Sequence, residues 1–434
     1  GASAAPARAA AGAAPRCGLL GSAPMTIPMA AHSRMAPRTV VLTLTLLMGV
    51  QPVSTDLYLP ALPTIARSLG ATLAAAQFTL SALILAFGVG QLAAGPLSDR
   101  WGRRPMLLGG LGCYVVASLL AATAPSIGWL IAWRALQGLA LAAVVTTARS
   151  IIRDLYEPLD GARVMSRALT GLGAIAVVGP LVGATVVTAL DWHAVMLVLG
   201  LFGAVTLAFV TRTFEETVPQ RDPRATHVAT LLRNWWQIVR DPTFGAFALL
   251  GAASYSGLFV FLASSSFVFI DTLGISRAAY GAFASSQAFA YLLGTLLCRR
   301  LLGRHGLRVA VRIGAAFSLA GGTTMAALSL TGWHDVWAIM LPNWLFVLGH
   351  GIHQPCSQAG AIGPFPEKAG TAASLSGFAM MAAAFAIGLW LGHSFDGTVY
   401  PLTLTIGACG VAVAAIAWTL VERHGEVRRA AGST

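Results

Sequence analysis

The sequence predicts an all-α membrane protein with twelve transmembrane helices in two six-helix bundles. Three observations lead to this prediction: a composition suited to lipid, a regular series of long apolar stretches, and an internal repeat. Of the 434 residues, 56% are hydrophobic and 10% are charged, whereas soluble domains average about 25% charged residues. A soluble chain of this length needs many more polar side chains at its surface, so lipid must contact much of this one.

Twelve apolar stretches of about twenty residues each are long enough to cross a hydrocarbon core of about 30 Å. The first six are 39–60, 74–97, 105–123, 127–150, 164–190 and 193–213. The second six are 243–271, 279–302, 307–330, 336–361, 370–393 and 399–421. The segment 214–242 is rich in Glu, Asp and Arg. We therefore expect a cytoplasmic linker there, between an N-terminal bundle (39–213) and a C-terminal bundle (243–421).

The two ends of the chain differ from the apolar stretches. Residues 1–38 are rich in Ala, Pro and Arg and contain no acid, so we expect a disordered tail, with a transit peptide as the alternative. Residues 422–434 are expected to form a cytoplasmic tail. With the N-terminus inside, 25 of the 28 Lys and Arg residues lie on the inner side, and the positive-inside rule then places both termini in the cytoplasm.

An internal repeat supports a duplicated fold. Residues 97–104 read LSDRWGRR and residues 301–308 read LLGRHGLR, with Leu, Arg, Gly and Arg recurring at an offset of 204. The same offset carries the start of the first span onto the start of the seventh, Thr39 onto Thr243. Two parallel halves related by duplication are typical of secondary transporters.

The loop after the second span resembles the loop signature GxLxDRxGRR of the major facilitator superfamily. In that family this loop latches the two halves together on the cytoplasmic side. Gly95 would permit close approach of helices and Gly102 would suit a tight turn. If the arginines served only to set the orientation in the membrane, neither the acid nor the glycines would be needed. The resemblance implies a gate motif formed by Gly95, Asp99, Arg100, Gly102, Arg103 and Arg104, and Asp154, on the same side, is expected to join it.

Two further segments are similar to motifs of the same superfamily. The fourth span contains RALQG, 134–138, which resembles RxxQG. The fifth contains GPLVG, 179–183, which resembles the antiporter motif gxxxGPxxGG, with Ala184 replacing the last glycine. Gly179, Pro180 and Gly183 would bend this helix and allow close packing; a generic packing kink is the alternative. In the family this motif is associated with exporters.

The end of the first span indicates one branch of the superfamily. The string DLYLPALP, 56–63, is similar to the bicyclomycin and chloramphenicol exporters of the Bcr/CflA branch. RDLY at 153–156 and GTAASL at 370–375 agree with that branch, and the resemblance covers residues 39–421. It implies a multi-pass protein of the bacterial inner membrane.

Asp56 and Arg134 are the main candidates for a functional site, and Tyr58 and Gln137 accompany them. Both charged residues are expected within about 10 Å of the outer boundary, at 1.5 Å rise per residue. A charge inside a span costs about 3 kcal/mol on insertion scales and requires a partner or a wet cavity, so we expect the two to pair. The alternatives are that Asp56 caps the helix end and that Arg134 snorkels to the surface.

The resemblance predicts a proton-coupled antiporter that exports small antimicrobials by alternating access. An exporter of an endogenous metabolite, such as an amino acid, remains an alternative, and an uptake symporter is a further one. No GxxxxGK[ST] motif is present, so we expect an ion gradient as the energy source, no cofactor and no catalysis. His350 and His353 share a helix face, but no third metal ligand is evident. The expected partners are a small-molecule drug, protons and lipid, with no nucleic acid, and the protein is expected to be a monomer.

Overall fold

The computed structural model describes residue 1 and residues 35–218, 221–223 and 225–425. The tails predicted at 1–38 and 422–434 lie largely outside this described part. All regular secondary structure within it is helical. The first set of helices is α1 Pro37–Asp56, α2 Leu62–Ser68, α3 Leu73–Trp101, α4 Arg103–Ala122, α5 Ile127–Leu155, α6 Pro158–Ala189 and α7 Trp192–Thr213. The rest are α8 Val228–Val239, α9 Pro242–Ser266, α10 Arg277–Leu330, α11 Val336–Ile362, α12 Ala369–Ser394, α13 Tyr400–Ile416 and α14 Glu422–His424.

Twelve of these segments are long enough to cross a membrane. Ten helices in the described residues are both long and apolar enough. One of them, α10, has 54 residues and bends at Gly306, where φ is 78°, so it comprises two crossings. The twelfth is α11, a 27-residue helix whose histidines, Asn343 and Gln354 make it more polar than the others. The fold is therefore the predicted twelve-helix membrane fold.

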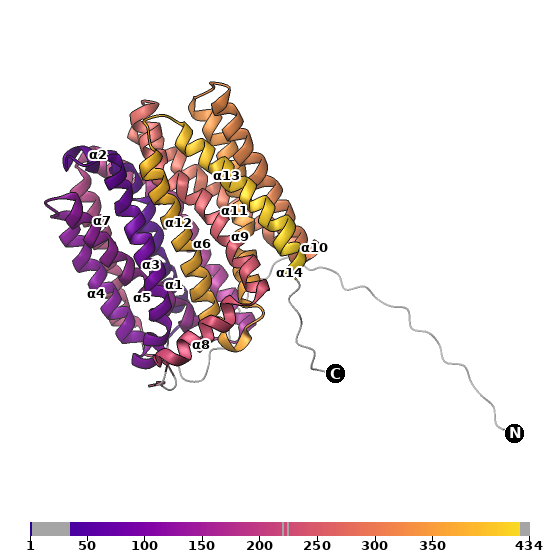
Figure 1. Cartoon of the computed structure of the whole chain (residues 1–434). Helices are drawn as coiled ribbons and strands as arrows, with labels where there is room; N and C mark the ends of the chain where they lie inside the picture. The colour runs from indigo at the N-terminus through magenta and orange to yellow at the C-terminus, as the bar shows by residue number, and fades with distance from the viewer. Residues whose placement is uncertain (2–34, 219–220, 224, 426–434) are drawn as a thin grey trace.

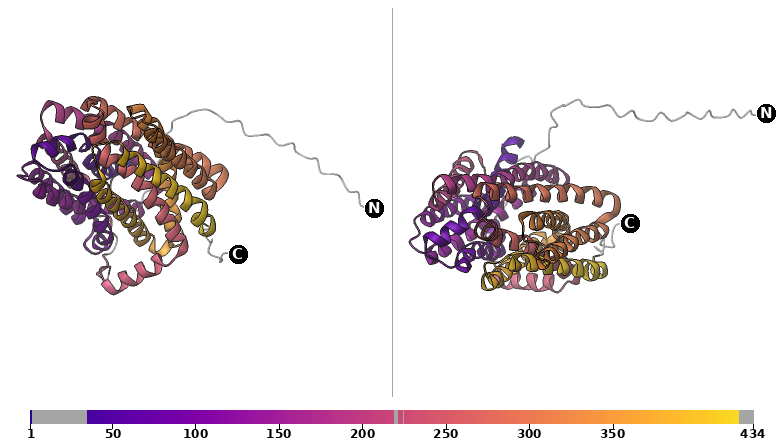
Figure 2. Two further views of the ribbon diagram at one scale, coloured as in Figure 1. Left: turned by 45° about the horizontal axis from the view of Figure 1, so that its top comes forward. Right: turned by 90° about the horizontal axis from the view of Figure 1, so that it is seen from above.

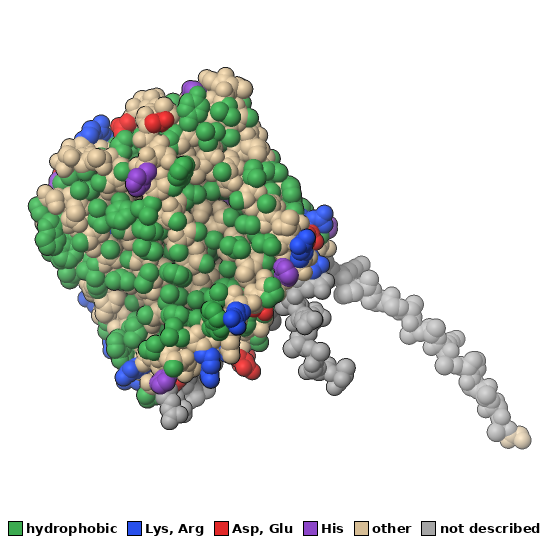
Figure 3. Space-filling model, viewed as in Figure 1, with side chains coloured by type: hydrophobic (Ala, Val, Ile, Leu, Met, Phe, Trp, Pro, Cys, Tyr) green, Lys and Arg blue, Asp and Glu red, His purple; other side chains and the backbone are tan. Residues whose placement is uncertain are grey.

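The helices stand side by side in a single bundle (Figure 1). Seen from above, helices from the beginning of the chain gather on one side and those from its end on the other (Figure 2). The main contacts between the two sets are α3 against α12 and α6 against α10. Apolar side chains cover the middle of the surface, and most charged side chains lie near its two ends (Figure 3). This pattern is that of a protein surrounded by lipid.

Polar residues at the loop ends determine where several helices begin. Five helices are capped by a side chain that accepts a hydrogen bond from a backbone N–H of the first turn, which satisfies one of the free donors there. The capping residues are Thr72, Asp191, Asp241, Ser276 and Asp335. At these five helices, a polar loop residue therefore marks the start of the helix.

The first span ends earlier than the sequence predicts. The prediction was 39–60, but α1 ends at Asp56 and a 3-10 turn, Leu59–Ala61, leads into α2. Pro60 and Pro63 lack an N–H and so cannot bond the carbonyls of Asp56 and Leu59, which stops the α-helical pattern. The chain turns at this point instead of continuing straight.

The two halves share a bend at the repeated glycine. Gly102, between α3 and α4, has φ of 106°, and Gly306, 204 residues later, has φ of 78°. Only glycine adopts this region readily. The backbone shape, as well as the sequence, therefore repeats.

The linker contains a helix that the sequence analysis did not predict. We expected 214–242 to be a polar segment, but 228–239 forms α8, which lies across one end of the bundle (Figure 1). We call this end the linker end. Ile238 is buried, whereas Val228, Leu232, Trp236 and Val239 are exposed at a spacing that places them on one stripe. The segment is therefore not simply a polar linker in water, because α8 carries an exposed apolar stripe.

Candidate functional site

Arg134 is fully buried inside the first set of helices and is bound by neutral groups. Its Nη1 donates to Oε1 of Gln137 at 2.8 Å, and its Nη2 donates to the backbone carbonyl of Ser54 at 2.8 Å. Its guanidinium carbon lies 4.0 Å from the centre of the Tyr58 ring, a cation–π contact. Gln137 in turn donates to Ser118 at 2.7 Å. The structure thus brings Arg134, Gln137 and Tyr58 together, and their role in a proton-coupling site stays a prediction.

The carbonyl of Ser54 is free to accept because α1 ends just beyond it. In a continuing helix, the N–H of Tyr58 would bond Ser54, but it bonds the carbonyl of Thr55 instead, at 3.2 Å. The side chain of Ser54 is held separately by the Tyr114 hydroxyl, at 2.6 Å. The early end of α1 therefore supplies the acceptor for Arg134.

Asp56 lies apart from Arg134, and the predicted ion pair is wrong. In the described part of the chain, Arg134 makes no ion pair. Asp56 is half-buried and accepts a hydrogen bond from Thr55 Oγ1 at 2.9 Å. Asp56 is two residues beyond Ser54, and each helical residue turns the side chain by about 100°. Arg134 therefore meets the backbone at Ser54, while the Asp56 side chain points elsewhere.

Asp56 lies between the antiporter-type motif and the second set of helices. A Cβ added at Gly179 would come within 3.5 Å of the Asp56 Cβ, and one added at Gly183 would overlap the carbonyl of Leu57. On the side of the second set, α6 meets α10, where a Cβ added at Gly281 would come within 3.0 Å of the carbonyl oxygen of Pro180. The glycines of α6 thus allow it to pack directly on the end of α1, beside Asp56.

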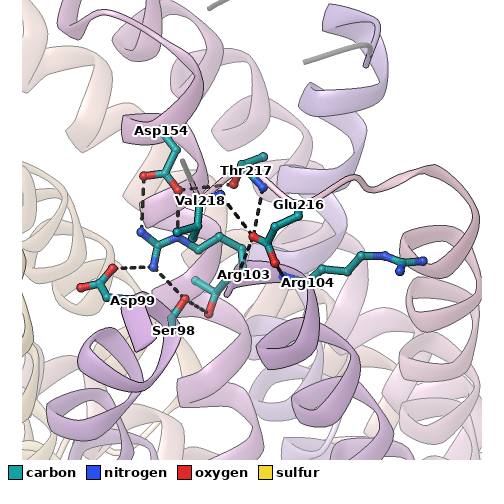
Figure 4. Close-up of polar contacts among 9 residues, drawn as sticks. Ser98, Asp99, Arg103, Arg104, Asp154, Glu216, Thr217 and Val218 are labelled. Atoms are coloured by element: carbon teal, nitrogen blue, oxygen red, sulfur yellow. Dashed lines mark hydrogen bonds and ion pairs between the residues drawn. The ribbon is translucent and has the colours of Figure 1, made fainter. Parts of the chain in front are cut away.

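Arg103 is the centre of the ionic network at the linker end (Figure 4). Its Nε lies 2.8 Å from Asp154 and its Nη1 lies 2.6 Å from Asp99. Nη1 also donates to Ser98 at 2.9 Å. The side chains of Arg103 and Asp154 are only 4% and 8% exposed, so this pair is shielded from water. The predicted association of Asp99, Arg103 and Asp154 is present in the structure.

Glu216 completes this network from the linker, and the sequence analysis missed it. Its Oε1 accepts from the backbone N–H of Arg103 at 2.9 Å, and its Oε2 accepts from that of Arg104 at 3.2 Å (Figure 4). These are the free donors at the start of α4, where a negative charge is favourable. The signal available in the sequence was the acidic pair 215–216 directly after the sixth span.

The other predicted motif residues hold the linker or lie apart. Arg100 donates to Thr226 at 2.6 Å, and the N–H of Asp222 bonds the carbonyl of Asp99 at 3.1 Å. The side chain of Arg104 donates to the carbonyl of Thr211. The expectation that Gly95 permits close approach is wrong, because an added Cβ would meet only Thr146, at 3.9 Å.

The network braces the first set of helices and the linker. The residues that Arg103, Asp154, Glu216 and Arg100 contact belong to α3, α4, α5 or residues 216–226. Among the described residues, none of its ion pairs reaches α9–α13. An ion pair between the two sets lies at the opposite end, where Arg67 and Asp271 are 3.6 Å apart.

The fold resembles that of known transporters. A bacterial homologue of the human lysosomal transporter Spinster, in an inward-facing and occupied conformation, aligns with a TM-score of 0.68 at 14% identity, over 91% of this chain and 98% of that one. The xylose transporter XylE from E. coli, in a partially occluded inward-open conformation, aligns with a TM-score of 0.69 at 14% identity, over 89% and 98%. At this identity the likeness concerns the fold.

Relatives matched by sequence share more identity with this chain than these two structures do. The chain is 32% identical over 320 residues to the chloramphenicol resistance protein of Pseudomonas aeruginosa, covering 73% of this chain and 74% of that protein. It is 31% identical over 340 residues to multidrug resistance protein D of Escherichia coli, covering 78% and 84%. It is 27% identical over 386 residues to the bicyclomycin resistance protein homologue of Haemophilus influenzae, covering 88% and 96%.

Residues 44–388 match the family described as Major Facilitator Superfamily. This match spans most of the chain, and the relatives named above carry the same resistance functions that the DLYLPALP string indicated. The chain therefore belongs to the major facilitator superfamily, in its bicyclomycin and chloramphenicol resistance (Bcr/CflA) branch.

Proposed function

We propose that this protein exports small antimicrobials of the chloramphenicol or bicyclomycin type in exchange for protons. It acts as a monomer in the bacterial inner membrane, with both termini in the cytoplasm. The cycle alternates a central site between the two sides of the membrane. The resistance functions of the relatives support a drug as substrate.

The position of Asp56 carries the proposal for proton exchange. It is a carboxyl group inside the membrane region, next to the Gly179–Gly183 segment of α6, and that segment also packs against α10 of the second set. A carboxyl placed between two moving bundles meets a different environment in each state. It can therefore bind a proton in one state and release it in the other, and a drug can compete with that proton.

Arg134 serves a different purpose in this scheme. Because the guanidinium is permanently charged and is bound to Ser54, Gln137 and Tyr58, it holds the end of α1 against α5. It thereby fixes the position of the turn that carries Asp56. We assign proton coupling to Asp56 and positioning to Arg134.

Transport by purified protein in liposomes tests the proposal. With a proton gradient imposed, labelled chloramphenicol should accumulate in liposomes containing the unchanged protein. Asp56→Asn should lose this gradient-driven accumulation but retain exchange of labelled for unlabelled drug, since the amide keeps the shape of the site and cannot carry the proton. Asp396→Asn, in the exposed loop after α12, is the matched control and should behave like the unchanged protein.

Two results would contradict the proposal. Full gradient-driven accumulation by Asp56→Asn would remove Asp56 as the coupling residue. No change in drug susceptibility when the protein is expressed in an efflux-deficient bacterium, across a panel of antimicrobials, would favour an endogenous metabolite as the substrate.

A further inference from the structure

A chain of hydrogen bonds joins two buried histidines of α11 to a serine of α9. His350 is 1% exposed, and His353 and Ser254 are fully buried. Ser254 Oγ lies 2.9 Å from Nδ1 of His350 and 3.3 Å from Nδ1 of His353. The other ring nitrogen of His353, Nε2, lies 3.2 Å from the carbonyl oxygen of Val311. The chain therefore runs from Val311 through His353 and Ser254 to His350.

The direction of each hydrogen bond follows from counting protons. The carbonyl of Val311 can only accept, so Nε2 of His353 carries the proton, and Nδ1 of a neutral His353 is an acceptor. Ser254 has one hydroxyl proton, which it donates to that Nδ1. Its oxygen then accepts from Nδ1–H of His350. His350 is thereby fixed with its proton on Nδ1, and its Nε2 is an acceptor without a proton.

The Nε2 atom of His350 has no hydrogen-bond partner among the described residues. Its ring lies beside two tyrosine rings, with centroids 6.1 Å from Tyr255 and 5.9 Å from Tyr291. The hydroxyl of Tyr291 is already bonded to Gln354. With the proton on Nδ1, Nε2 is the free acceptor of this ring, so this atom is suited to a donor that arrives from outside the protein.

These rings face the first set of helices. The helix that carries Tyr255, α9, contacts α3 and the 3-10 turn at 59–61 of the first set. Leu292, adjacent to Tyr291, lies against Gly173 of α6, where an added Cβ would come within 3.1 Å of the leucine. The rings of Tyr255 and Tyr291, which lie beside the histidine ring, are therefore carried by helices that meet the first set.

We infer that His350 Nε2 is the acceptor that binds an O–H or N–H donor of the exported compound. Tyr255 and Tyr291 contact the apolar or aromatic body of that compound. The inference rests on the proposed export function and adds the chemical class of substrate, an aromatic or cyclic molecule with a hydroxyl or amide donor. A metal ion is not the occupant we propose, since no group of three His, Cys, Asp or Glu lies together in the described part of the chain.

The first test measures the tautomer directly. Nitrogen-15 NMR of protein labelled at histidine, in lipid nanodiscs, distinguishes Nδ1–H from Nε2–H rings. One buried histidine should show the Nδ1–H pattern, and its signals should vanish in His350→Asn. Ser254→Ala removes the oxygen that accepts from Nδ1, so the His350 ring should shift toward the Nε2–H form. An Nε2–H ring at His350 in the unchanged protein would overturn the inference, whatever the protein transports.

The second test measures binding of chloramphenicol to the purified protein. Asn can still donate from the position of Nδ1 but has no atom at the position of Nε2. His350→Asn should therefore weaken binding roughly tenfold, the usual effect of one lost hydrogen bond. His305→Asn, at an exposed position near the linker end, should bind like the unchanged protein. Equal binding by both variants would overturn the inference.

The two failures can be told apart. If the unchanged protein neither binds nor exports chloramphenicol or bicyclomycin, the proposed function is wrong. The NMR result then stands by itself on whether His350 presents a free acceptor. If the unchanged protein exports the drug and His350→Asn exports it with the same apparent affinity, the proposed function holds and the assignment of His350 is wrong.

Discussion

The two glycine bends, at Gly102 and at Gly306, have the same backbone geometry and different surroundings. At the first, Asp99, Arg103, Asp154 and Glu216 form a network that ties α3, α4 and α5 to the linker. At the second, Gly306 separates two helical stretches of α10 by a kink. The residues 204 positions after those four are Gly303, Leu307, Gln358 and Leu420. None of these can form an ion pair.

The comparison separates the shape of the bend from the network around it. The glycine alone is sufficient to turn the backbone, because both halves have it and both turn. In the described residues, the network of Asp99, Arg103, Asp154 and Glu216 belongs to the first half. The network contacts the linker, which connects the two halves. A shift of α3 or α4 would therefore change the contacts of the linker. We therefore expect changes at the first bend to affect the whole protein and changes at the second to stay local.

The largest difference between the bends is expected for loss of Arg103. Arg103→Gln leaves the shielded carboxylate of Asp154 without a cation, which costs about 3 kcal/mol in the free energy of unfolding. Arg304→Gln, beside the second bend and exposed, should cost less than about 0.5 kcal/mol. Denaturant unfolding in detergent measures both. Equal losses would show that the network contributes nothing particular to the first half.

A smaller difference is expected for the glycines themselves. Gly306→Ala places a side chain at φ of 78° with nothing within 4 Å, which costs about 1 kcal/mol. Gly102→Ala carries the same strain and also displaces Glu216, so it should cost about 2 kcal/mol. The excess should disappear when Glu216 is already alanine. An excess that persists in Glu216→Ala would place its cause elsewhere.

The smallest effect concerns Asp56 and Arg134. Because the two side chains do not pair, the stability losses of Asp56→Asn and Arg134→Gln should add within about 0.5 kcal/mol. The losses of Arg134→Gln and Gln137→Leu should not add, since these residues share a hydrogen bond of 2.8 Å. If the two stability losses are clearly not additive, Asp56 and Arg134 form an ion pair in another state of the transporter.

The sequence predicted the number of helices well because lipid imposes a simple rule on length and polarity. The network around Arg103 was predicted because the loop resembles a family motif and because Asp154 follows the fourth span on the same side. The sequence analysis missed α8, since the apolar stripe of Val228, Leu232, Trp236 and Val239 lies within a charged segment. The many charged residues of this segment obscured the helical spacing of its apolar side chains.

The sequence could not predict the partner of Arg134. That partner is a backbone carbonyl, which is free because α1 ends at Asp56. Every residue has a backbone carbonyl, so the sequence does not show which one lacks a helical hydrogen bond. The choice between Ser54 and Asp56 depends on helix rotation near a proline-containing turn. Span boundaries are too uncertain to fix such a rotation.

The bond from Arg134 to the Ser54 carbonyl also affects how this protein can evolve. Every amino acid supplies the same carbonyl, so substitutions at position 54 leave the acceptor in place as long as the turn forms. Random mutagenesis should tolerate varied residues at 54 that fit beside Tyr114. It should tolerate few at 60, where Pro60 helps to end the helix. A mutational scan would then show position 54, which touches the buried charge, as more permissive than position 60, which does not.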